Sequence, residues 1–204
     1  MVVLLGPNGA GKTTTLRALA GAIGLQAGTV LRNGLAVRTA LDKRARAGMA
    51  LVTEERSVFP SLTVEQNLRV GRCNVDHALD LFPELAGRLR VPAGLISGGE
   101  QQMLTLGRAL ARAPSLLLAD ELSLGLGPKI VERLLTAVSS AADSGIAVLL
   151  VEQHVRRALE MADRGYVLAR GRVEAEGTAS QLRSQVADIE RSYLALSDAP
   201  SENQ

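Results

Sequence analysis

Cysteine, tryptophan and long apolar runs are scarce or missing in this sequence. Its 204 residues contain one cysteine, Cys73, no tryptophan, two phenylalanines and two tyrosines. A lone cysteine excludes an intrachain disulfide and favours a reducing compartment. The longest apolar run, at residues 146–151, has the length of a buried strand and falls far short of the roughly 18 residues that a membrane span requires. We therefore expect a soluble protein with no direct membrane insertion.

An excess of charge of one sign is also missing. The 23 lysines and arginines nearly balance the 21 aspartates and glutamates, and no dense basic run is present. Binding to nucleic-acid phosphates requires a concentrated basic surface, so we expect no nucleic-acid partner. The apolar residues at the amino terminus lead directly into a glycine-rich loop, an order that does not fit a secretory signal peptide.

Short apolar runs alternate with amphipathic segments along the chain. Apolar runs predict buried strands at residues 1–5, 48–53, 116–119, 146–151 and 166–169. Periodic segments predict helices at residues 12–22, 63–70, 75–81, 101–113, 128–142, 155–163 and 178–196. Strands that alternate with helices imply an α/β fold with a mainly parallel sheet flanked by helices.

Residues 6–13 read Gly-Pro-Asn-Gly-Ala-Gly-Lys-Thr and fit the P-loop pattern G-x-x-x-x-G-K-[ST]. Glycines let backbone N–H groups approach phosphate oxygens, and the following helix directs its positive end at the anion. Lys12 is predicted to reach the β- and γ-phosphates, and the Thr13 hydroxyl to ligate Mg²⁺. The predicted ATP-binding residues of this loop are Gly6, Pro7, Asn8, Gly9, Ala10, Gly11, Lys12, Thr13 and Thr14.

Two adjacent acids, Asp120 and Glu121, follow the apolar run at residues 116–119. The carboxyl ends of strands are where open α/β sheets bind their ligands. Asp120 is predicted to hold Mg²⁺, and Glu121 to take a proton from the attacking water. Many strands end in acids without any function, so this pair does not define a reaction by itself.

A third segment, residues 97–102, reads Ser-Gly-Gly-Glu-Gln-Gln and precedes a predicted helix. Alone it is typical of a turn with a serine helix cap. A P-loop, then this segment, then an apolar strand ending in Asp-Glu resembles the ATP-binding-cassette (ABC) ATPases, from about residue 2 to residue 196. The resemblance implies that Ser97, Gly98, Gly99 and Glu100 of one subunit bind ATP held by the P-loop of another.

The resemblance implies roles for further residues. His154 matches the switch histidine, with a contact to the γ-phosphate, and Ser123-Leu-Gly-Leu matches the D-loop. Glu54 stands where the family usually has glutamine; it is either a ligand of Mg²⁺ or water, or a solvated acid in a loop. Leu122 replaces the proline that usually follows the catalytic acid.

The same resemblance implies a division of the chain into parts. Residues 1–57 and 101–196 correspond to the ATP-binding core, and residues 58–100 to a small inserted helical subdomain that carries the signature segment. The stretch between Leu68 and Asp76 is short for this subdomain, so we expect it to be trimmed. Residues 197–204 are polar and predict a flexible tail.

Several segments resemble the ATP-binding subunits of branched-chain amino acid importers. They include residues 58–68, the Phe82-Pro-Glu-Leu segment and Leu150-Val-Glu-Gln-His. The implied partners are membrane permease subunits and a second ABC ATPase subunit, identical or different, at the cytoplasmic inner face of the cell membrane. The open alternatives are import of urea or short amides, a cassette without a transporter, and a truncated subunit that binds ATP weakly.

The start of the chain departs from the family pattern. Family members have antiparallel strands and an adenine-stacking aromatic residue ahead of the P-loop, whereas five residues precede Gly6 here. The aromatic residues Phe59, Phe82, Tyr166 and Tyr193 all lie downstream. Base stacking contributes about 1–3 kcal/mol, so its loss predicts ATP binding weakened by roughly tenfold to a hundredfold. We expect an amino-terminal truncation and an uncovered sheet edge or core face.

Overall fold

The structure is a computed structural model, and it describes residues 1–197. The first half of the chain contains β1 (Val2–Leu5), α1 (Lys12–Ala20), β2 (Leu31–Arg32), β3 (Leu35–Ala36), α2 (Leu41–Arg46), β4 (Met49–Val52), α3 (Val64–Val70), α4 (Val75–Leu81), η1 (Pro83–Arg88) and η2 (Ala93–Leu95). The second half contains α5 (Gly98–Leu110), β5 (Leu116–Asp120), α6 (Pro128–Asp143), β6 (Ala147–Glu152), α7 (Val155–Met161), β7 (Arg164–Ala169), β8 (Arg172–Thr178), α8 (Ala179–Ser184) and α9 (Val186–Ser197). The predicted tail lies outside the described residues, except for Ser197 at the end of α9.

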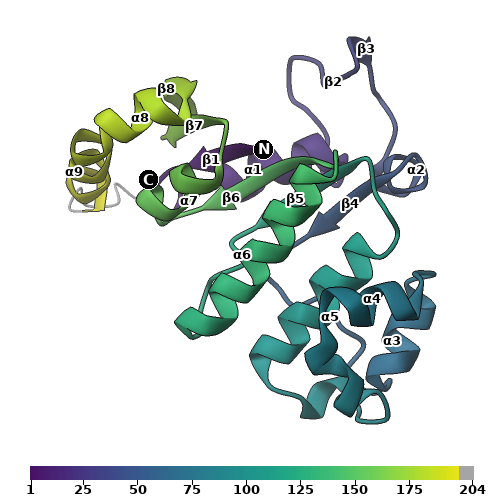
Figure 1. The fold of residues 1–204 in the computed structure, drawn as a ribbon. Coiled ribbons are helices and arrows are strands. Elements are labelled where there is room, and N and C mark those ends of the chain that lie inside the picture. The colour runs from purple at the N-terminus through teal and green to yellow at the C-terminus, as the bar shows by residue number, and fades with distance from the viewer. Residues whose placement is uncertain (198–204) are drawn as a thin grey trace, which may run out of the picture.

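Six strands form one sheet in the order β4-β5-β6-β1-β7-β8, and β2 pairs with β3 in a separate hairpin. The strands from β4 to β7 pair in parallel, whereas β8 runs antiparallel to β7 along one edge. Parallel neighbours require crossover connections, which the helices supply (Figure 1). The predicted α/β fold with a mainly parallel sheet is confirmed.

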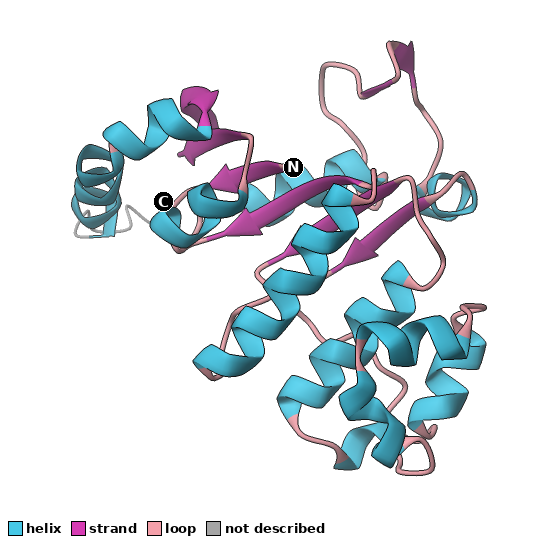
Figure 2. Ribbon diagram, viewed as in Figure 1, coloured by secondary structure: helices cyan, strands magenta, loops and turns pink. Residues whose placement is uncertain are grey.

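Alternate side chains of the central strands enter two separate cores, because successive residues of a strand point to opposite faces. Val3 and Leu5 of β1 belong to the larger core, to which α5, α6 and α7 contribute. Leu4 belongs to the smaller core, together with Leu16 and Ala20 of α1. Helices therefore cover both faces (Figure 2), and the carboxyl ends of the parallel strands meet at one edge of the sheet.

The helices α3 and α4, the short turns η1 and η2, and α5 form a helical region beside the sheet (Figure 1). Its loop before α3 is held by the buried Asn67, whose amide donates to the carbonyls of Phe59, Leu62 and Thr63. Helix α5 packs against α3 and α4 on one side and against β4 on the other. Because α5 joins the helical region to the sheet, the division at residues 58–100 stays a prediction.

The prediction of a single closing helix over residues 178–196 is wrong. Helix α8 ends at Ser184, and Gln185 has φ −108° and ψ 7° before α9 begins at Val186. The break allows both Leu182 and Ile189 to enter the larger core. Burial of apolar side chains from both segments outweighs the helix propensity that favoured one continuous helix.

Strand β8, the β2–β3 hairpin and α2 have no counterpart among the predicted elements. β8 is an edge strand with mostly exposed side chains, so it contains no apolar run. The hairpin turns at Asn33-Gly34, where both residues have positive φ of 52° and 77°. An Asn-Gly pair is the strongest short-range hairpin signal, and it was the one available clue.

The β2–β3 hairpin projects away from the sheet (Figure 1) and exposes two leucines. Leu31 and Leu35 are 63% and 73% exposed. An apolar cavity of about 210 Å³ lies between the hairpin and the sheet, where Leu116, Leu118 and Leu149 form part of its wall. The smaller core is therefore only partly covered on this side.

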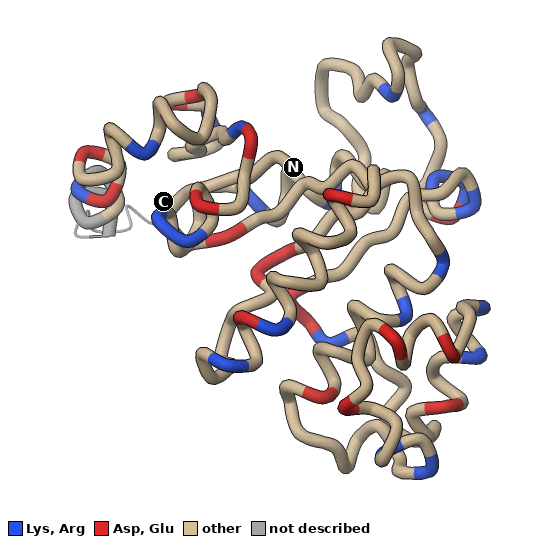
Figure 3. Tube along the Cα trace, viewed as in Figure 1, with Lys and Arg blue, Asp and Glu red and all other residues tan. Residues whose placement is uncertain are grey.

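Acidic and basic residues are distributed over all parts of the trace (Figure 3). Charges of both signs occur in the helical region as well as around the sheet. Within residues 1–197, no helix combines the length and the apolar character that crossing a membrane requires.

Candidate nucleotide-binding site

The P-loop connects the end of β1 to the start of α1 at the carboxyl edge of the sheet. Gly11 caps α1 with φ 98°, a left-handed conformation that a side chain disfavours. At Gly6 a Cβ atom would lie 2.4 Å from the backbone oxygen of Leu168, so only glycine fits there. The loop is also tied down by hydrogen bonds from the Ala10 N–H to the Pro7 carbonyl and from the Gly171 N–H to the Ala10 carbonyl.

Lys12 is the buried cation of this loop. Its side chain is 4% exposed, and its Nζ donates to the carbonyl oxygens of Gly6 at 2.9 Å and Pro7 at 3.0 Å. The same nitrogen lies 3.3 Å from Oε1 of Glu121. The ammonium group is therefore fixed between the P-loop after β1 and the acid after β5, and β6 lies between these two strands in the sheet.

Asp120 is the last residue of β5 and is 1% exposed. Burial raises the pKa of its carboxyl group, and the nearby charges of Glu121 and Glu54 raise it further. A hydrogen bond from the Thr13 hydroxyl and the charge of Lys12 lower this pKa. Its Oδ1 has no hydrogen-bond partner within the part of the chain that the structure describes. A buried acceptor oxygen beside the threonine of a P-loop fits a site for a divalent cation.

Glu121 is held by both its backbone and its side chain. Its φ of 46° lies in the left-handed region, and its N–H donates to the Val151 carbonyl at 3.0 Å. Oε2 accepts a 2.6 Å hydrogen bond from the amide of Gln153, and Oε1 faces Lys12. Non-glycine residues in this region cost about 1–3 kcal/mol, a strain that is common at functional sites.

Lys12, Thr13 and Glu121 border a cleft of about 420 Å³, whereas the buried Asp120 does not line it. Its lining residues are Asn8, Gly9, Gly11, Lys12, Thr13, Thr14, Glu54, Glu121, Leu124 and Gln153. The fold thus brings together most of the predicted P-loop residues with Glu54 and Glu121, from segments far apart in the sequence. Within residues 1–197 there is no cluster of three or more histidine, cysteine or acidic side chains able to hold a metal. A P-loop site does not require such a cluster, because hydroxyl and phosphate oxygens complete the ligand set.

Other predicted site residues lie outside this cleft. His154 is exposed at the start of α7 and does not line it. Ser97, Gly98, Gly99 and Glu100 form the start of α5 and do not line it either. Their roles toward ATP therefore stay predictions.

The signature segment forms a capping box at the start of α5. The Ser97 hydroxyl accepts from the Glu100 N–H, and the Glu100 carboxylate accepts from the Ser97 N–H at 2.8 Å. Arg88 also donates to this carboxylate at 2.8 Å, and this bond lowers the pKa of Glu100. Both the capping role predicted from Ser97 alone and a binding role are compatible with this geometry.

Two residues at the end of β6 were missed as site residues. Gln153 lines the cleft and bonds Glu121, while Glu152 is 4% exposed and accepts from the Ser123 hydroxyl at 2.9 Å. A signal was available, because Glu152 is an acid at the end of an apolar strand, as Asp120 is. Only the fold reveals that these two strands are neighbours.

A mainly parallel sheet, a P-loop with its buried lysine after β1, and two carboxylates at the end of β5 define a P-loop nucleoside-triphosphate-binding protein. The ABC transporter family model matches residues 1–123, and the chain belongs to this family of ATP-hydrolysing, nucleotide-binding cassettes.

Two curated relatives are similar over most of their length. The chain is 42% identical to the high-affinity branched-chain amino acid transport ATP-binding protein BraG of Pseudomonas aeruginosa, over 89% of this chain and 82% of the relative. It is 39% identical to the probable branched-chain amino acid transport ATP-binding protein LivF of Archaeoglobus fulgidus, over 89% of this chain and 82% of the relative. A dimeric ATP-binding cassette solved in a post-hydrolysis state with ADP and Pi shares the fold, with a TM-score of 0.77 at 22% identity, over 88% of this chain and 85% of that one.

Proposed function

We propose that this chain is the ATP-hydrolysing subunit of an importer of branched-chain or related amino acids. The observation that carries the catalytic part is the ion pair of Lys12 with Glu121 at the wall of the cleft, with Nζ and Oε1 3.3 Å apart. This ion pair at the cleft wall supports Lys12 as the phosphate-binding cation and Glu121 as the base. The names of BraG and LivF support the substrate class, and an importer of urea or short amides is the alternative that transport assays distinguish.

In the proposed reaction, backbone N–H groups of residues 9–13 and the Lys12 ammonium bind the triphosphate. Glu121 takes a proton from the water that attacks the γ-phosphorus, and His154 contacts the γ-phosphate. Thr13 and Asp120 would hold Mg²⁺, with Glu54 beside them, and the cation when bound neutralises phosphate charge. Within the described residues 1–197, Oδ1 of Asp120 has no hydrogen-bond partner, which supports this assignment.

The test of this assignment is Glu121→Gln in the full chain. The amide keeps the size of the side chain but cannot accept the proton, so turnover is expected to fall by about 10²- to 10⁴-fold. Binding of a fluorescent ATP analogue is expected to stay within about threefold of the parent value, because the P-loop contacts are unchanged. Turnover at the parent rate would show that Glu121 is not the base.

The ATP site is proposed to be completed by a second cassette. Ser97, Gly98, Gly99 and Glu100 lie outside the cleft of their own chain and face ATP bound to the partner's P-loop in this proposal. Closure of the pair over two ATP molecules then provides the differential binding energy, and hydrolysis releases it. The partner is an identical chain or a related subunit.

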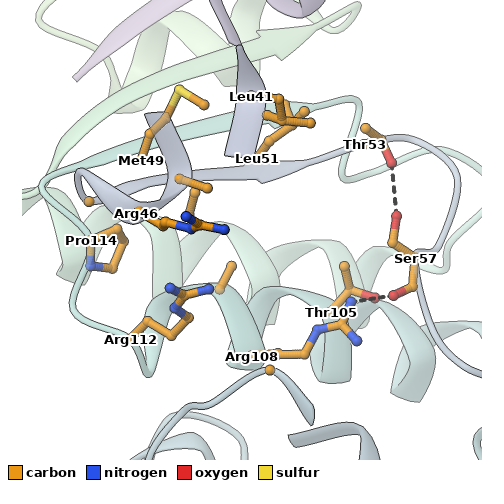
Figure 4. Close-up of a pocket in the computed structure, with 15 residues that line it drawn as sticks. Leu41, Arg46, Met49, Leu51, Thr53, Ser57, Thr105, Arg108, Arg112 and Pro114 are labelled. Carbon is orange, nitrogen blue, oxygen red and sulfur yellow. Dashed lines mark hydrogen bonds between the residues drawn. The ribbon is translucent and has the colours of Figure 1, made fainter. Parts of the chain in front are cut away.

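A second cavity, of about 540 Å³, is proposed as the place where the permease docks on the cytoplasmic side of the membrane. This groove lies between α2, β4 and α5, and Leu41, Met49 and Leu51 form apolar parts of its wall. Figure 4 shows Arg46, Arg108 and Arg112 around it. The three arginines favour a permease segment that carries negative charge.

The loop at residues 53–57 connects this groove to the ATP cleft. Glu54 lines the cleft, while Thr53 and Ser57 line the groove and their hydroxyls lie 3.2 Å apart (Figure 4). Arg108 of α5 donates to the Ser57 carbonyl. A change at the cleft can therefore reach the groove through one short loop, which supports coupling of hydrolysis to transport.

A further inference from the structure

The loop after the proposed catalytic acid is fastened to the end of β6 by three hydrogen bonds. The Glu121 N–H donates to the Val151 carbonyl at 3.0 Å. The Gln153 amide donates to Oε2 of Glu121 at 2.6 Å, and the Ser123 hydroxyl donates to Oε2 of Glu152 at 2.9 Å. Two consecutive side chains of one strand end thus hold two residues of the neighbouring strand end.

We propose that Gln153 is a positioning residue for Glu121 and that Glu152, through Ser123, holds the loop that carries it. This inference rests on the proposed role of Glu121 as the base. We name the pair of side-chain bonds, Gln153 to Glu121 and Ser123 to Glu152, the β6 clasp.

The clasp fixes the carboxylate in one orientation. Oε1 faces Lys12 at 3.3 Å and Oε2 faces Gln153 at 2.6 Å, so each oxygen has its own partner. When Lys12 engages phosphate, Gln153 continues to hold Oε2 and leaves Oε1 to accept the proton from water. A general base must be held near its reacting geometry, and displacement by about 1 Å costs on the order of a hundredfold in rate.

The Glu152 anchor carries a cost that a merely space-filling residue would avoid. Its side chain is 4% exposed, its Oε1 has no hydrogen-bond partner within residues 1–197, and burial raises the pKa of its carboxyl group. Leu122, between the two held residues, is 1% exposed and packs in the larger core. The loop is therefore anchored by one apolar contact and three hydrogen bonds, and the two side-chain bonds of the clasp set the direction of Glu121.

The experiment measures kcat, KM for ATP and the Kd of a fluorescent ATP analogue for variants of the full chain. Gln153→Ala is expected to lower kcat by about tenfold to a hundredfold and to leave KM and Kd within about twofold, because position and not binding is lost. Ser123→Ala and Glu152→Leu each remove one side of the second bond and are expected to lower kcat, and the double variant to fall no further than the stronger single variant.

Conservative and remote variants separate positioning from general damage. Ser123→Thr keeps the hydroxyl donor, and Glu152→Gln keeps an oxygen acceptor. Each variant is expected to retain most of the parent kcat. Gln26→Ala changes an exposed glutamine that is distant in the sequence from Ser123, Glu152 and Gln153. The kcat of this variant is expected to equal that of the parent. Should Glu152→Leu fail to fold, Ser123→Ala and Gln153→Ala still test the clasp.

Parent kcat in Gln153→Ala, or losses in Ser123→Ala and Glu152→Leu that add fully, would overturn the clasp. Glu121→Gln is measured beside them. If Glu121→Gln abolishes turnover while Gln153→Ala does not alter it, the clasp fails and the proposed function stands. If Glu121→Gln leaves turnover intact, the proposed base is wrong and the clasp loses its premise.

Discussion

Three acidic side chains, Asp120, Glu121 and Glu152, are buried at the ends of two neighbouring strands. Burying a carboxylate is costly unless cations or hydrogen bonds compensate for lost water. Lys12 and Gln153 provide this for Glu121, whereas one oxygen of Asp120 and one of Glu152 lack a partner within residues 1–197. The site therefore reduces the free energy of unfolding in exchange for a preset arrangement of charge.

The burial of the Glu152 carboxyl group predicts that the free energy of unfolding depends on pH, and Glu152→Gln removes this part of the dependence. Burial raises the pKa of Glu152 above its ordinary 4.5. As the pH rises, the unfolded chain therefore loses this proton at a lower pH than the folded chain does. The contribution of Glu152 to stability is greatest below pH 4.5 and is lost as the pH rises through the ordinary value toward the raised one. Glu152→Gln, which cannot ionise, is expected to be more stable than the parent at pH 7 and equally stable at pH 4.

Urea unfolding of the two proteins from pH 4 to pH 8 measures this difference. Titrating groups that do not interact with Glu152 contribute equally to both chains, whereas the charges of His154 and Glu121 act on it directly. A gain that is the same at every pH would mean that the carboxyl group ionises as readily in the folded chain as in the unfolded one.

At the scale of elements, the helices α3, α5 and α8 begin with the same device, a reciprocal capping box, and the first two allow a comparison. Thr63 caps α3 with Gln66, and Ser97 caps α5 with Glu100, each in a reciprocal capping box. The α3 cap lies away from the ATP cleft, whereas Ser97 belongs to the proposed surface toward the second cassette. A comparison of substitutions at Thr63 and Ser97 therefore distinguishes an effect on helix stability from an effect on ATP turnover.

Thr63→Ala and Ser97→Ala are each expected to lower the free energy of unfolding by about 1 kcal/mol, because each removes one helix cap. Ser97→Ala alone is expected to lower turnover of the assembled pair by more than tenfold, in line with the loss of a charge-assisted contact to phosphate. Denaturant unfolding and ATPase assays on the same samples measure both effects. Equal losses of turnover in the two variants would assign Ser97 a capping role only.

At the scale of the whole molecule, the groove and the ATP cleft lie on two sides of the loop at residues 53–57. Arg112 is exposed at the groove and is not needed for ATP binding in the proposed mechanism. Its charge can therefore be reversed to test docking without altering the P-loop.

Arg112→Glu is expected to reduce co-purification with the permease by about tenfold or more, because it places like charges at the proposed interface. Its Kd for an ATP analogue is expected to equal the parent value. Arg183→Glu, an exposed reversal on α8, serves as the matched control and is expected to retain the permease. Equal retention by Arg112→Glu would exclude the groove as the docking surface.

The sequence alone was sufficient to predict the fold class, because the two signals of that class, apolar strands and the phosphate loop, are both local in the sequence. Apolar runs such as residues 116–119 and 146–151 mark buried strands, and the spacing of glycines around Lys12 marks a phosphate loop. Elements without such signals were missed or misjudged: β8 is held by its pairing with β7, and the break at Gln185 by burial of Leu182 and Ile189.

The sequence by itself determined which residues are proposed to carry the chemistry: Lys12, Thr13, Asp120 and Glu121 follow from motifs in which neighbours along the chain act together. The tertiary structure decided which of them meet and what holds them. The β5–β6 pairing brings Gln153 to Glu121 from 32 positions away, and no local pattern encodes that contact. Strand neighbours are chosen by the packing of two whole cores, so the partners of a catalytic group emerge only when the sheet is assembled.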